Sequence, residues 1–333
     1  MSVHIAIAGA TGAVGQELLT VLAERKFPIA SLRLLASKNS SGKTMTFAGQ
    51  TYTVEELTHE SFNGVQIAFF SAGGSISKEF APSAVKAGAI VVDNTSAFRM
   101  RDGIPLVIPE VNPAAIHKHV GIIANPNCST IIMNVPVWPL HQYNRVKRIV
   151  VSTYQAVSGA GAWGLHELDQ QTRDYAAGKP PTAHKFPHVI LGNVFSHDTA
   201  IGDNGYNEEE LKMLNETRKI FADPRIAITA TCIRVPVPRA HSESINLEFE
   251  RPITVEEVRR VLSKAPGVKI VDNPATSHFP MPIEAANQDD VLVGRIRQDI
   301  SRDDGRGIDL FVSGDQIRKG AATNAVQIAE RLL

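Results

Sequence analysis

Short aliphatic runs and segments of helical length alternate along the first 127 residues of the chain. The runs expected to form strands are residues 3–9, 32–37, 65–74, 89–96, 105–112 and 120–126, and the expected helices include 13–24 and 78–87. Val, Ile and Ala follow one another in these runs with little polar interruption, which is typical of strands buried on both faces. The pattern therefore predicts a mostly parallel, doubly wound α/β sheet.

After residue 145 the strands become longer and contain more Ser and Thr. The expected strands are 148–159, 226–237 and 242–250, and the expected helices lie near 162–177, 207–221 and 254–264. This pattern predicts an antiparallel or mixed sheet with helices on one side, the α+β plan of a second domain. Residues 178–206 carry three prolines and four glycines, and we expect this connection to line a site or to cover a subunit interface. Residues 313–333 are expected to form a helix that completes the first domain.

The composition, with 43% hydrophobic and 20% charged residues, is that of a soluble globular protein, and 333 residues suggest about two domains. Lys and Arg (34) balance Asp and Glu (34), so no net positive charge would attract nucleic acid or an anionic membrane surface. No apolar run is long enough for a membrane helix, and the N-terminus lacks the features of a secretory signal. Two well-separated cysteines form no disulfide framework, so we expect a cytoplasmic protein.

The first expected strand runs directly into GATGAVG, which places Gly9, Gly12 and Gly15 at three-residue spacing before a helical segment. In a dinucleotide-binding fold such glycines allow a tight turn, a close approach of the backbone to a pyrophosphate, and close packing of helix on strand. The spacing differs from the commonest G-x-G-x-x-G, and a plain strand-to-helix turn is the alternative. We interpret the first domain as a Rossmann-like domain that binds a nicotinamide cofactor.

The end of the second expected strand bears on which nicotinamide cofactor is bound. An Asp or Glu there usually binds the ribose 2′-hydroxyl of NAD. This chain has Ser37, Lys38, Asn39 and Ser40 instead, so it offers hydroxyls and a cation to a 2′-phosphate and no carboxylate that would repel it. We therefore predict NADP rather than NAD, with a solvated polar loop as the alternative.

Cys128 lies between the turn-forming sequence NPN and the helical run STIIMNVPVWPL. The N–H groups and the dipole at a helix N-terminus favour the thiolate, which is the reactive form of cysteine. The position makes Cys128 a candidate nucleophile for attack on a carbonyl carbon, although a small buried thiol at the start of a core helix would fit the same pattern. Cys232 lies in the middle of an expected strand and is interpreted as a structural core residue.

A cysteine nucleophile that acts on an aldehyde needs a group to take and return protons, and histidine suits this role near neutral pH. Among eleven histidines, His241 is the strongest candidate because it follows Arg234 by seven residues at the end of an expected strand. His184 and His188 have the i, i+4 spacing of metal ligands, but Pro187 argues against a helix there and no further ligand stands at metal spacing. We therefore predict no metal site.

Eight motifs extend in order over nearly the whole chain, from residue 5 to residue 330. They are GATGAVG, DNTSAFRM, PLVIPEVN, NPNCST, YQAVSGAG, EEELKM, CIRVPVPRAHSES and GAATNAVQIAE. Together they resemble the bacterial aspartate-β-semialdehyde dehydrogenase family. The resemblance implies an NADP-binding Rossmann-like domain of residues 1–127 with 313–333, and an α+β catalytic and dimerisation domain, residues 128–312, of the glyceraldehyde-3-phosphate dehydrogenase-like type.

Residue by residue, the resemblance implies that Cys128 is the nucleophile, His241 the acid/base catalyst and Gln155 the residue that orients the acyl group. It also implies an arginine that grips the substrate carboxylate in a bidentate pair, an acid that receives the substrate ammonium, and two cations that bind phosphate. These residues are Arg234, Glu209 (with Glu208 adjacent), and the pair Arg99 and Lys212, with Asn127 in the same pocket.

The expected cofactor contacts combine the glycine turn, the polar loop and further positions implied by the resemblance. They are Gly9, Thr11, Gly12, Ala13, Val14, Gly15, Ser37, Lys38, Asn39, Ser40, Ser71, Ala72, Gly73, Ser158, Gly159 and Asn324. At Asn39 many members of the family carry an arginine, so the strength of the NADP preference stays open.

The activity implied by the resemblance is the NADP-dependent, reversible reductive dephosphorylation of L-4-aspartyl phosphate to L-aspartate 4-semialdehyde and phosphate through a cysteine thioester. This reaction serves the biosynthesis of lysine, by way of diaminopimelate, and of methionine and threonine. The resemblance also implies a homodimer, or a higher oligomer, formed through the second domain. Two alternatives are N-acetyl-γ-glutamyl-phosphate reductase, whose substrate has no ammonium for Glu209, and a catalytically silent paralogue that acts as a binding protein.

Overall fold

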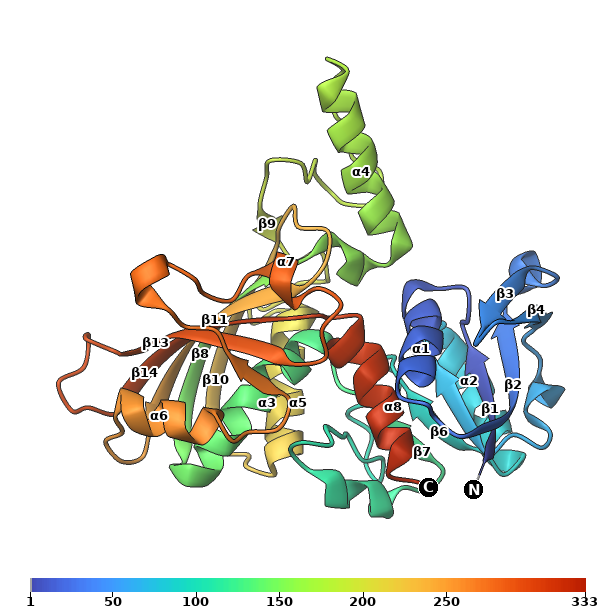
Figure 1. Cartoon of the computed structure of the whole chain (residues 1–333), viewed down its shortest axis with the longest axis horizontal. Helices are drawn as coiled ribbons and strands as arrows, with labels where there is room; N and C mark the ends of the chain where they lie inside the picture. Colours follow the sequence, from blue (N-terminus) through green and yellow to red (C-terminus); the bar gives the residue numbers. More distant parts are fainter. Residues whose placement is uncertain (1) are drawn as a thin grey trace. The chain divides into compact units, whose positions relative to one another are not determined.

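The computed structural model describes residues 2–333 and divides the chain into two compact units (Figure 1). Unit 1 comprises the chain up to Asn127 together with Ala321–Leu333, and unit 2 comprises Cys128–Gly320. Unit 1 is discontinuous in sequence because its last helix returns after unit 2 is complete. Within the described residues, none of the helices combines the length and the apolar character that crossing a membrane requires.

Unit 1 is built on a seven-stranded sheet in the order β3-β4-β2-β1-β5-β6-β7. Neighbouring strands are parallel except for β3 and β4. The strands are β1 (Val3–Ala8), β2 (Ile29–Ala36), β3 (Thr44–Phe47), β4 (Gln50–Glu56), β5 (Ile67–Phe70), β6 (Ile90–Asp93) and β7 (Ile122–Ala124). The helices are α1 (Ala13–Glu24), α2 (Gly74–Lys86) and α8 (Thr323–Glu330), with short turns η1 (Lys38–Ser40), η2 (His59–Phe62) and η3 (Pro113–Lys118). The predicted parallel α/β architecture is confirmed.

The central strands of unit 1 end level with one another. Ala8, the last residue of β1, pairs with Leu35 of β2 on one side and with Phe70 of β5 on the other. Parallel strands place their carboxyl ends at the same edge of a sheet, which is where ligands bind in open α/β folds. The loops that follow β1, β2 and β5 therefore leave the sheet as neighbours.

Unit 2 is built on a second seven-stranded sheet, of mixed direction, in the order β12-β13-β14-β11-β8-β10-β9. The strands are β8 (Val146–Gln155), β9 (Phe195–Ser196), β10 (Ala227–Arg234), β11 (His241–Phe249), β12 (Val268–Ile270), β13 (Val291–Gln298) and β14 (Gly307–Gly314). The helices are α3 (Cys128–Tyr143), α4 (Ala162–Ala176), α5 (Glu208–Phe221), α6 (Val255–Leu262) and α7 (Pro282–Ala285), with short turns η4 (Val157–Ala160), η5 (Pro274–Thr276) and the π-helical η6 (Arg318–Ala322). Helices α3, α5 and α6 cover one face, whereas α4 extends away from the sheet (Figure 1). The predicted α+β plan is confirmed.

Two neighbouring rows of polar side chains lie on the face of this sheet that α5 covers. The strand register defines an inner row of Cys232, Thr153 and Glu243 and an outer row of Arg234, Gln155 and His241. The rows are two residues apart along each strand and share a face because side chains alternate across a strand. The Sγ of Cys232 lies 3.9 Å from the Sδ of Met213 in α5, so this face is the covered one.

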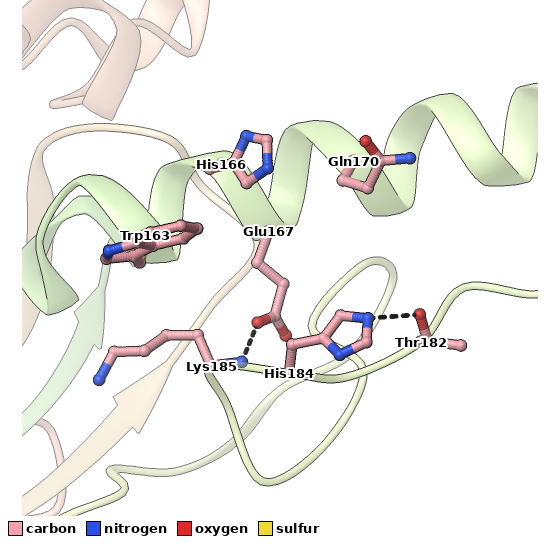
Figure 2. Close-up of a pocket in the computed structure, with 7 residues that line it drawn as sticks. All are labelled: Trp163, His166, Glu167, Gln170, Thr182, His184 and Lys185. Carbon is pink, nitrogen blue, oxygen red and sulfur yellow. Dashed lines mark hydrogen bonds between the residues drawn. The ribbon is translucent and has the colours of Figure 1, made fainter.

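Two buried side chains of α4 hold the connection 178–206 in place. The Oε1 of Gln171 accepts the backbone N–H of Ile190 at 3.0 Å, and its Nε2 donates to the carbonyl oxygen of Thr182 at 2.9 Å. Glu167 accepts the backbone N–H of Lys185, as Figure 2 shows. These side-chain bonds take the place of the backbone hydrogen bonds of a helix or sheet. The connection is therefore held in place with little regular secondary structure.

Residues 105–112, expected to be a strand, contain only an isolated bridge at Leu106. The two prolines of this segment cannot donate to a ladder. The side chain of Asn112 instead accepts the N–H of Ile108 and donates to the carbonyl oxygen of Leu106, each at 2.9 Å. The prediction of a strand is wrong here, since an asparagine side chain satisfies the backbone in a turn.

Residues 313–320 belong to unit 2 and not to the first domain, where the sequence pattern places them. The chain is still in β14 at Gly314. The side chain of Asp315 then accepts the backbone N–H groups of Ile317 and Arg318 at 2.9 and 3.0 Å, which turns the chain. The C-terminal helical region therefore begins at Arg318, and the part of it that completes unit 1 is α8.

Candidate active site

Cys128 is the first residue of α3 and the first residue of unit 2. The helix approaches β14 closely because Gly314 has no side chain; a Cβ there would lie 2.9 Å from Cγ1 of Ile132. Gly320 likewise leaves space for the cysteine, since a Cβ at Gly320 would lie 2.9 Å from the Cβ of Cys128. Two glycines of unit 2 thus determine where the sulfur can be.

His241, the first residue of β11, is completely buried. Its Nε2 lies 3.6 Å from the Sγ of Cys128. Its Nδ1 lies 2.9 Å from the backbone nitrogen of Ala156, and Nδ1 must be the acceptor because an N–H can only donate. In the neutral ring the proton is therefore on Nε2, the nitrogen that faces the sulfur.

The surroundings of His241 keep its ring neutral and fixed. Complete burial, followed by the nearby charge of Arg234, lowers the pKa of His241 to about 3. A Cβ at Gly159 would lie 3.1 Å from Cε1 of His241 and 3.3 Å from Nη1 of Arg234, so the turn η4 packs closely against both side chains. His241 is thus an oriented hydrogen-bond donor beside the cysteine.

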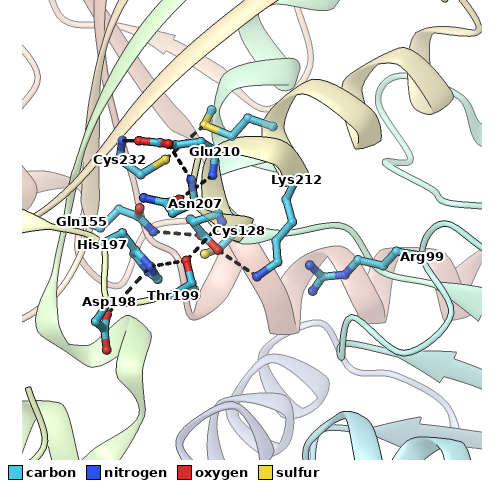
Figure 3. Close-up of polar contacts among 12 residues, drawn as sticks. Arg99, Cys128, Gln155, His197, Asp198, Thr199, Asn207, Glu210, Lys212 and Cys232 are labelled. Atoms are coloured by element: carbon cyan, nitrogen blue, oxygen red, sulfur yellow. Dashed lines mark hydrogen bonds and ion pairs between the residues drawn. The ribbon is translucent and has the colours of Figure 1, made fainter. Parts of the chain in front are cut away.

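Gln155 ends β8, and its side chain is held at both ends of the amide. The Oγ1 of Thr153 donates to Oε1 of Gln155 at 3.1 Å, and Nε2 of Gln155 donates to Oε1 of Glu209 at 3.1 Å. Because an ionised carboxylate only accepts hydrogen bonds, these partners determine which way the amide points. Figure 3 shows Gln155 beside the start of α5, to which Glu209 belongs.

Helix α5 begins with a capping box in which Asn207 and Glu210 exchange side-chain and backbone hydrogen bonds of 2.9 Å. The i, i+3 spacing then puts Glu209 and Lys212 on one face of the helix, where Nζ of Lys212 lies 3.1 Å from Oε2 of Glu209. Glu209 is 4% exposed, whereas Glu208 is exposed to solvent. The acid that faces the outer row is therefore Glu209.

Arg234 ends β10 and is 2% exposed. Its Nη2 lies 2.8 Å from Nε2 of His197 and 3.1 Å from Oδ1 of Asp198. The guanidinium carbon lies 5.5 Å from the ring centre of Phe186. These three neighbours all belong to the connection 178–206, which therefore lines the site, one of the two roles expected for it.

Three residues of the site, His197, Asp198 and Gly320, were not predicted from the sequence. The two polar residues lie in a connection without periodicity, so nothing in the sequence indicates their distance from Arg234. Gly320 lies in a segment expected to be an ordinary helix, where a glycine has no assigned purpose. The signal that could have drawn attention to the two polar residues is an adjacent His–Asp pair within the long connection that contains prolines and glycines.

The glycine turn of unit 1 depends on missing side chains. Gly9 has φ +92°, and a Cβ there would lie 2.7 Å from the backbone carbon of Ser71. A Cβ at Gly15 would lie 2.2 Å from the carbonyl oxygen of Gly9. Gly12 is the N-cap of α1, and neither a side-chain cap nor an acidic residue occupies that helix start. The turn therefore presents backbone N–H groups and the positive end of a helix, which suits a pyrophosphate.

The other residues of unit 1 predicted to contact the cofactor at the carboxyl edge of its sheet follow β1, β5 and β2. Thr11, Ala13 and Val14 belong to the glycine turn and the first turn of α1, and Ser71, Ala72 and Gly73 lead into α2. The residues after β2 are Ser37, Lys38, Asn39 and Ser40, of which the first three are exposed. These three loops are neighbours in unit 1, and no carboxylate stands among them.

Ser158 and Gly159 lie in η4 of unit 2. The hydroxyl of Ser158 donates to the carbonyl oxygen of Pro238 and accepts from Nε2 of Gln316 at 2.6 Å. The position of η4, which also packs on His241, is thus fixed by side-chain bonds within unit 2.

Arg99 and Asn324 of unit 1 both bind the loop that follows β7. Arg99 is 8% exposed, and it donates through Nε to the carbonyl oxygen of Asn125 at 2.9 Å and through Nη2 to that of Asn94 at 2.8 Å. Asn324 is fully buried and donates to Oδ1 of Asn125 at 2.6 Å. Asn127, also buried, immediately precedes the cysteine. The phosphate, cofactor and substrate roles of these residues stay predictions.

Cys232 is fully buried in the inner row, and burial raises the pKa of its thiol, so it is poorly suited to act as a nucleophile. His184 bonds the hydroxyl of Thr182 at 3.0 Å (Figure 2). Among residues 2–333, no group of three or more His, Cys, Asp or Glu side chains is arranged to hold a metal ion.

Two family models match the chain. The model described as "Semialdehyde dehydrogenase, NAD binding domain" matches residues 4–119, and "Semialdehyde dehydrogenase, dimerisation domain" matches residues 137–319. The first match lies within unit 1 and the second within unit 2.

Relatives match over the full length. An aspartate-semialdehyde dehydrogenase of Synechocystis is 56% identical over 331 residues, 99% of this chain and 97% of that protein. The crystal structure of aspartate semialdehyde dehydrogenase II from Vibrio cholerae, complexed with ASA, has a TM-score of 0.96 at 47% identity and covers 100% of this chain and 98% of that one. The Candida albicans enzyme, solved with NADP, has a TM-score of 0.77 at 26% identity, with coverage of 100% and 98%. The family inferred from the motifs is confirmed: this chain belongs to the aspartate-semialdehyde dehydrogenase family.

Proposed function

We propose that this protein catalyses the reversible, NADP-dependent reductive dephosphorylation of L-4-aspartyl phosphate to L-aspartate 4-semialdehyde and phosphate. The observation that carries the proposal is the placement of Cys128 at the start of α3, with Nε2 of His241 3.6 Å from its sulfur. A catalytically silent paralogue has no need of this pair. Reduction of an acyl phosphate through a thioester requires both a nucleophile and a group that stabilises the carbonyl oxygen.

In the reductive direction the Cys128 thiolate attacks the carbonyl carbon of the acyl phosphate. A C–S bond forms, the bond between the carbonyl carbon and the phosphate oxygen breaks, and the phosphate takes up one proton from water as it leaves as hydrogen phosphate. The start of α3 favours the thiolate that this step needs. The bound cofactor supplies the hydride that reduces the resulting thioester. Breaking the C–S bond then releases the aldehyde and restores the thiolate.

His241 stabilises the negative charge that develops on the carbonyl oxygen at each addition step. Its Nδ1 accepts from the backbone N–H of Ala156, so Nε2–H is the donor that the ring offers to the reacting group. A neutral imidazole can act in this way without taking up a proton. The sequence analysis expects His241 to act as an acid and base. We propose instead that it donates a hydrogen bond from Nε2 and does not take up a proton.

Substrate recognition is proposed to use two opposite charges, the guanidinium of Arg234 in the outer row and the carboxylate of Glu209, which faces this row from α5. Arg234 binds the substrate carboxylate, and Glu209 receives the ammonium while Gln155 orients the acyl group between them. A buried carboxylate at Glu209 favours a substrate with an ammonium over one with an acylated nitrogen, which argues against N-acetyl-γ-glutamyl phosphate. Arg99 and Lys212 are proposed to bind the phosphate, and Asn127 to contribute to the substrate pocket.

The cofactor is proposed to be NADP, held by the three neighbouring loops of unit 1, by Ser158 and Gly159, and by Asn324. The fit to a pyrophosphate rests on the turn where a Cβ at Gly9 or Gly15 would collide with backbone atoms. Preference for the 2′-phosphate rests on Lys38 and on the absence of a carboxylate between Ser37 and Ser40.

The decisive assay measures nicotinamide reduction from aspartate semialdehyde with and without phosphate. We expect turnover with NADP that requires phosphate, and absence of turnover in the wild-type protein would refute the assignment. Lys38→Glu should lower kcat/KM for NADP relative to NAD, whereas Lys86→Glu, an exposed charge change at the far end of α2, should leave that ratio unchanged.

A second assay separates the two acyl-phosphate reductases. Aspartate semialdehyde and N-acetylglutamate semialdehyde are compared as substrates of the wild type and of Glu209→Ala. We expect activity with the first aldehyde only, and a marked loss of it in the variant. Unchanged activity in Glu209→Ala would count against the ammonium-binding role.

We also infer that the protein is a homodimer formed through unit 2. We infer further that it acts in the biosynthesis of lysine, methionine and threonine. The dimerisation-domain match over residues 137–319 supports the first of these inferences. Sedimentation at several protein concentrations tests it: a species of one chain mass at all of them would contradict a dimer.

A further inference from the structure

The guanidinium of Arg234 offers five N–H bonds to its surroundings. Nη1 donates to the carbonyl oxygen of Ala156 at 3.0 Å. Nη2 donates to Nε2 of His197 at 2.8 Å and to Oδ1 of Asp198 at 3.1 Å, so both of its hydrogens are engaged. The buried Nε has no hydrogen-bond partner among the described residues. Figure 3 shows His197 and Asp198 next to each other at this point of the site.

A carboxylate can bind an arginine through two parallel hydrogen bonds on either of two edges of the guanidinium. One edge consists of Nε and Nη2, and the other of Nη1 and Nη2. Both edges need a hydrogen of Nη2. A substrate carboxylate held by Arg234 in this way must therefore displace His197 or Asp198.

His197 is the more firmly held of the two. Its backbone N–H donates to the carbonyl oxygen of Cys232 at 2.8 Å. Because Nε2 accepts from the arginine, Nδ1 carries the proton and donates to Oγ1 of Thr199 at 3.3 Å. That hydroxyl also accepts the backbone N–H of Glu209 at 3.3 Å. Burial lowers the pKa of His197, in agreement with a neutral acceptor. Displacing this ring would break a chain of bonds that reaches the start of α5.

Asp198 can move at a lower cost. Its side chain keeps 21% of its surface exposed, against 2% for Arg234, so a carboxylate that rotates away reaches water. Burial alone would raise the pKa of Asp198, but the hydrogen bond and the charge of Arg234 hold that pKa below its usual range. The departing and the arriving group are thus both carboxylates, and the buried guanidinium is paired before and after the exchange. An unpaired buried charge, the costly alternative, does not arise.

We propose that Asp198 is a specificity-determining residue that occupies the carboxylate-binding edge of Arg234 and yields it to the carboxylate of the substrate. The proposal rests on the proposed role of Arg234 in binding that carboxylate. Competition of this kind multiplies the apparent dissociation constant by the reciprocal of the fraction of molecules in which the edge is free of Asp198. It affects only ligands that carry the carboxylate.

The test compares two aldehydes with the variant Asp198→Asn. Aspartate semialdehyde carries the carboxylate, whereas the decarboxylated analogue, 3-aminopropanal, has the same aldehyde and amine without it. We expect the KM of aspartate semialdehyde to fall about three- to tenfold with unchanged kcat, and the KM of the decarboxylated analogue to stay the same. Asp203→Asn makes the same charge change at an exposed position of the same connection and should alter neither KM.

A rise in the KM of aspartate semialdehyde, or a fall in kcat, would show that Asp198 positions Arg234, and an unchanged KM would show that it does not compete. Either result overturns the exchange. Asp198→Ser, which also removes the charge, repeats the measurement if thermal unfolding shows that the asparagine variant is not folded.

Arg234→Lys separates failure of this proposal from failure of the proposed function. If Arg234 binds the carboxylate, the lysine variant should raise the KM of aspartate semialdehyde far more than that of the decarboxylated analogue. A ratio of the two KM values unchanged in Arg234→Lys would refute the role of Arg234 itself. A ratio changed there but not in Asp198→Asn would refute only the exchange.

Discussion

The two regions proposed to bind ligands differ in what shapes them, which is the backbone in unit 1 and buried side chains in unit 2. In unit 1 the edge of the parallel sheet is shaped by backbone, with glycines at positions 9, 12 and 15 where side chains would collide or cap the helix. In unit 2 the buried side chains of the outer row are held by side chains around them, as Gln155 is held between Thr153 of the inner row and Glu209 of α5. A backbone site tolerates almost no added atoms, whereas a side-chain site is sensitive to the loss of a partner.

The difference also determines what a substitution can disturb. A backbone site fails through steric displacement, so stability and cofactor affinity should fall together. A side-chain network fails through one missing hydrogen bond or charge, so chemistry can be lost while the fold is kept. Each of the following experiments tests this difference between the two regions.

The largest effect is expected from replacing Cys128, the proposed nucleophile of the site in unit 2. Cys128→Ser should lower kcat on the order of 10⁴-fold or more, because covalent catalysis depends on the thiolate. Steady-state rates of nicotinamide reduction measure the loss. Unfolding stability should stay close to that of the wild type, since the two side chains have similar shapes.

Cys232→Ala is the matched control, since this thiol is fully buried in the inner row. It should cost roughly 1–3 kcal/mol of unfolding free energy and leave kcat unchanged. An equal loss of activity in the two cysteine variants would contradict the proposal that Cys128 is the nucleophile and Cys232 only a core residue.

The next largest effect is expected at the backbone site. Gly15→Ala would place a Cβ 2.2 Å from the carbonyl oxygen of Gly9, where only backbone can give way. We expect a loss of about 1–3 kcal/mol in unfolding free energy together with weaker NADP binding, measured by urea unfolding and by fluorescence titration.

Gly74→Ala, in α2 of the same unit, is the control for this change. Its Cβ would meet nothing nearer than Oγ of Ser96 at 3.9 Å, so stability and affinity should be nearly unaffected. Full NADP affinity in Gly15→Ala would contradict a turn built by close backbone approach.

A smaller effect is expected from replacing Gln155, which we propose orients the acyl group. Gln155→Leu keeps most of the volume and removes both hydrogen bonds, which should reduce kcat/KM roughly ten- to hundredfold. Thr153→Val removes only the hydroxyl that holds Oε1 of Gln155, so a loss of a few fold is expected. The kcat/KM of both variants is measured with aspartate semialdehyde. A larger loss in Thr153→Val than in Gln155→Leu would contradict the proposal that Gln155 orients the acyl group and Thr153 only holds Gln155.

The smallest effect is expected from pH. His241 in the unfolded chain has a pKa near 6.5, and burial lowers it to about 3 in the folded protein. Below about pH 6.5 the unfolded state therefore binds a proton that the folded state does not, so stability falls as pH falls, by up to about 1.4 kcal/mol per pH unit. Above that pH this contribution is constant.

His241→Gln should remove part of this acid sensitivity. Urea unfolding at pH 7 and pH 5.5 should show a smaller difference in the variant than in the wild type. Burial also lowers the pKa of His141 and of His197, so part of the dependence should persist. An equal dependence in both proteins would mean that His241 is protonated in the folded state.

The contrast between the two regions explains what the sequence could predict. The glycine turn was visible because its constraint is local, within seven consecutive residues that follow a buried strand. The strand expected at 105–112 was wrong because an aliphatic run does not reveal that Asn112 satisfies its backbone. Strands β13 and β14 were not predicted, because exposed Arg295 and Arg297 and half-buried Asp309 interrupt their apolar pattern.

The side-chain site was predictable only in part. Cys128 and His241 could be proposed from their positions at the ends of elements, and the other roles came from the resemblance of whole motifs. The partnership of Arg234 with His197 and Asp198 was out of reach, since it depends on how the connection 178–206 folds back along α4. Long-range pairings of this kind leave no periodic trace in the chain.

The contact between Cys128 and Gly320 has a consequence for synthesis of the protein. These residues are the first and the last of unit 2, so the residue that packs against Cys128 is synthesised after the rest of unit 2. A nascent or truncated chain that stops before Gly320 has the cysteine but lacks its final surroundings. The thiol of Cys128 is thus enclosed on this side only after the whole of unit 2 has been synthesised.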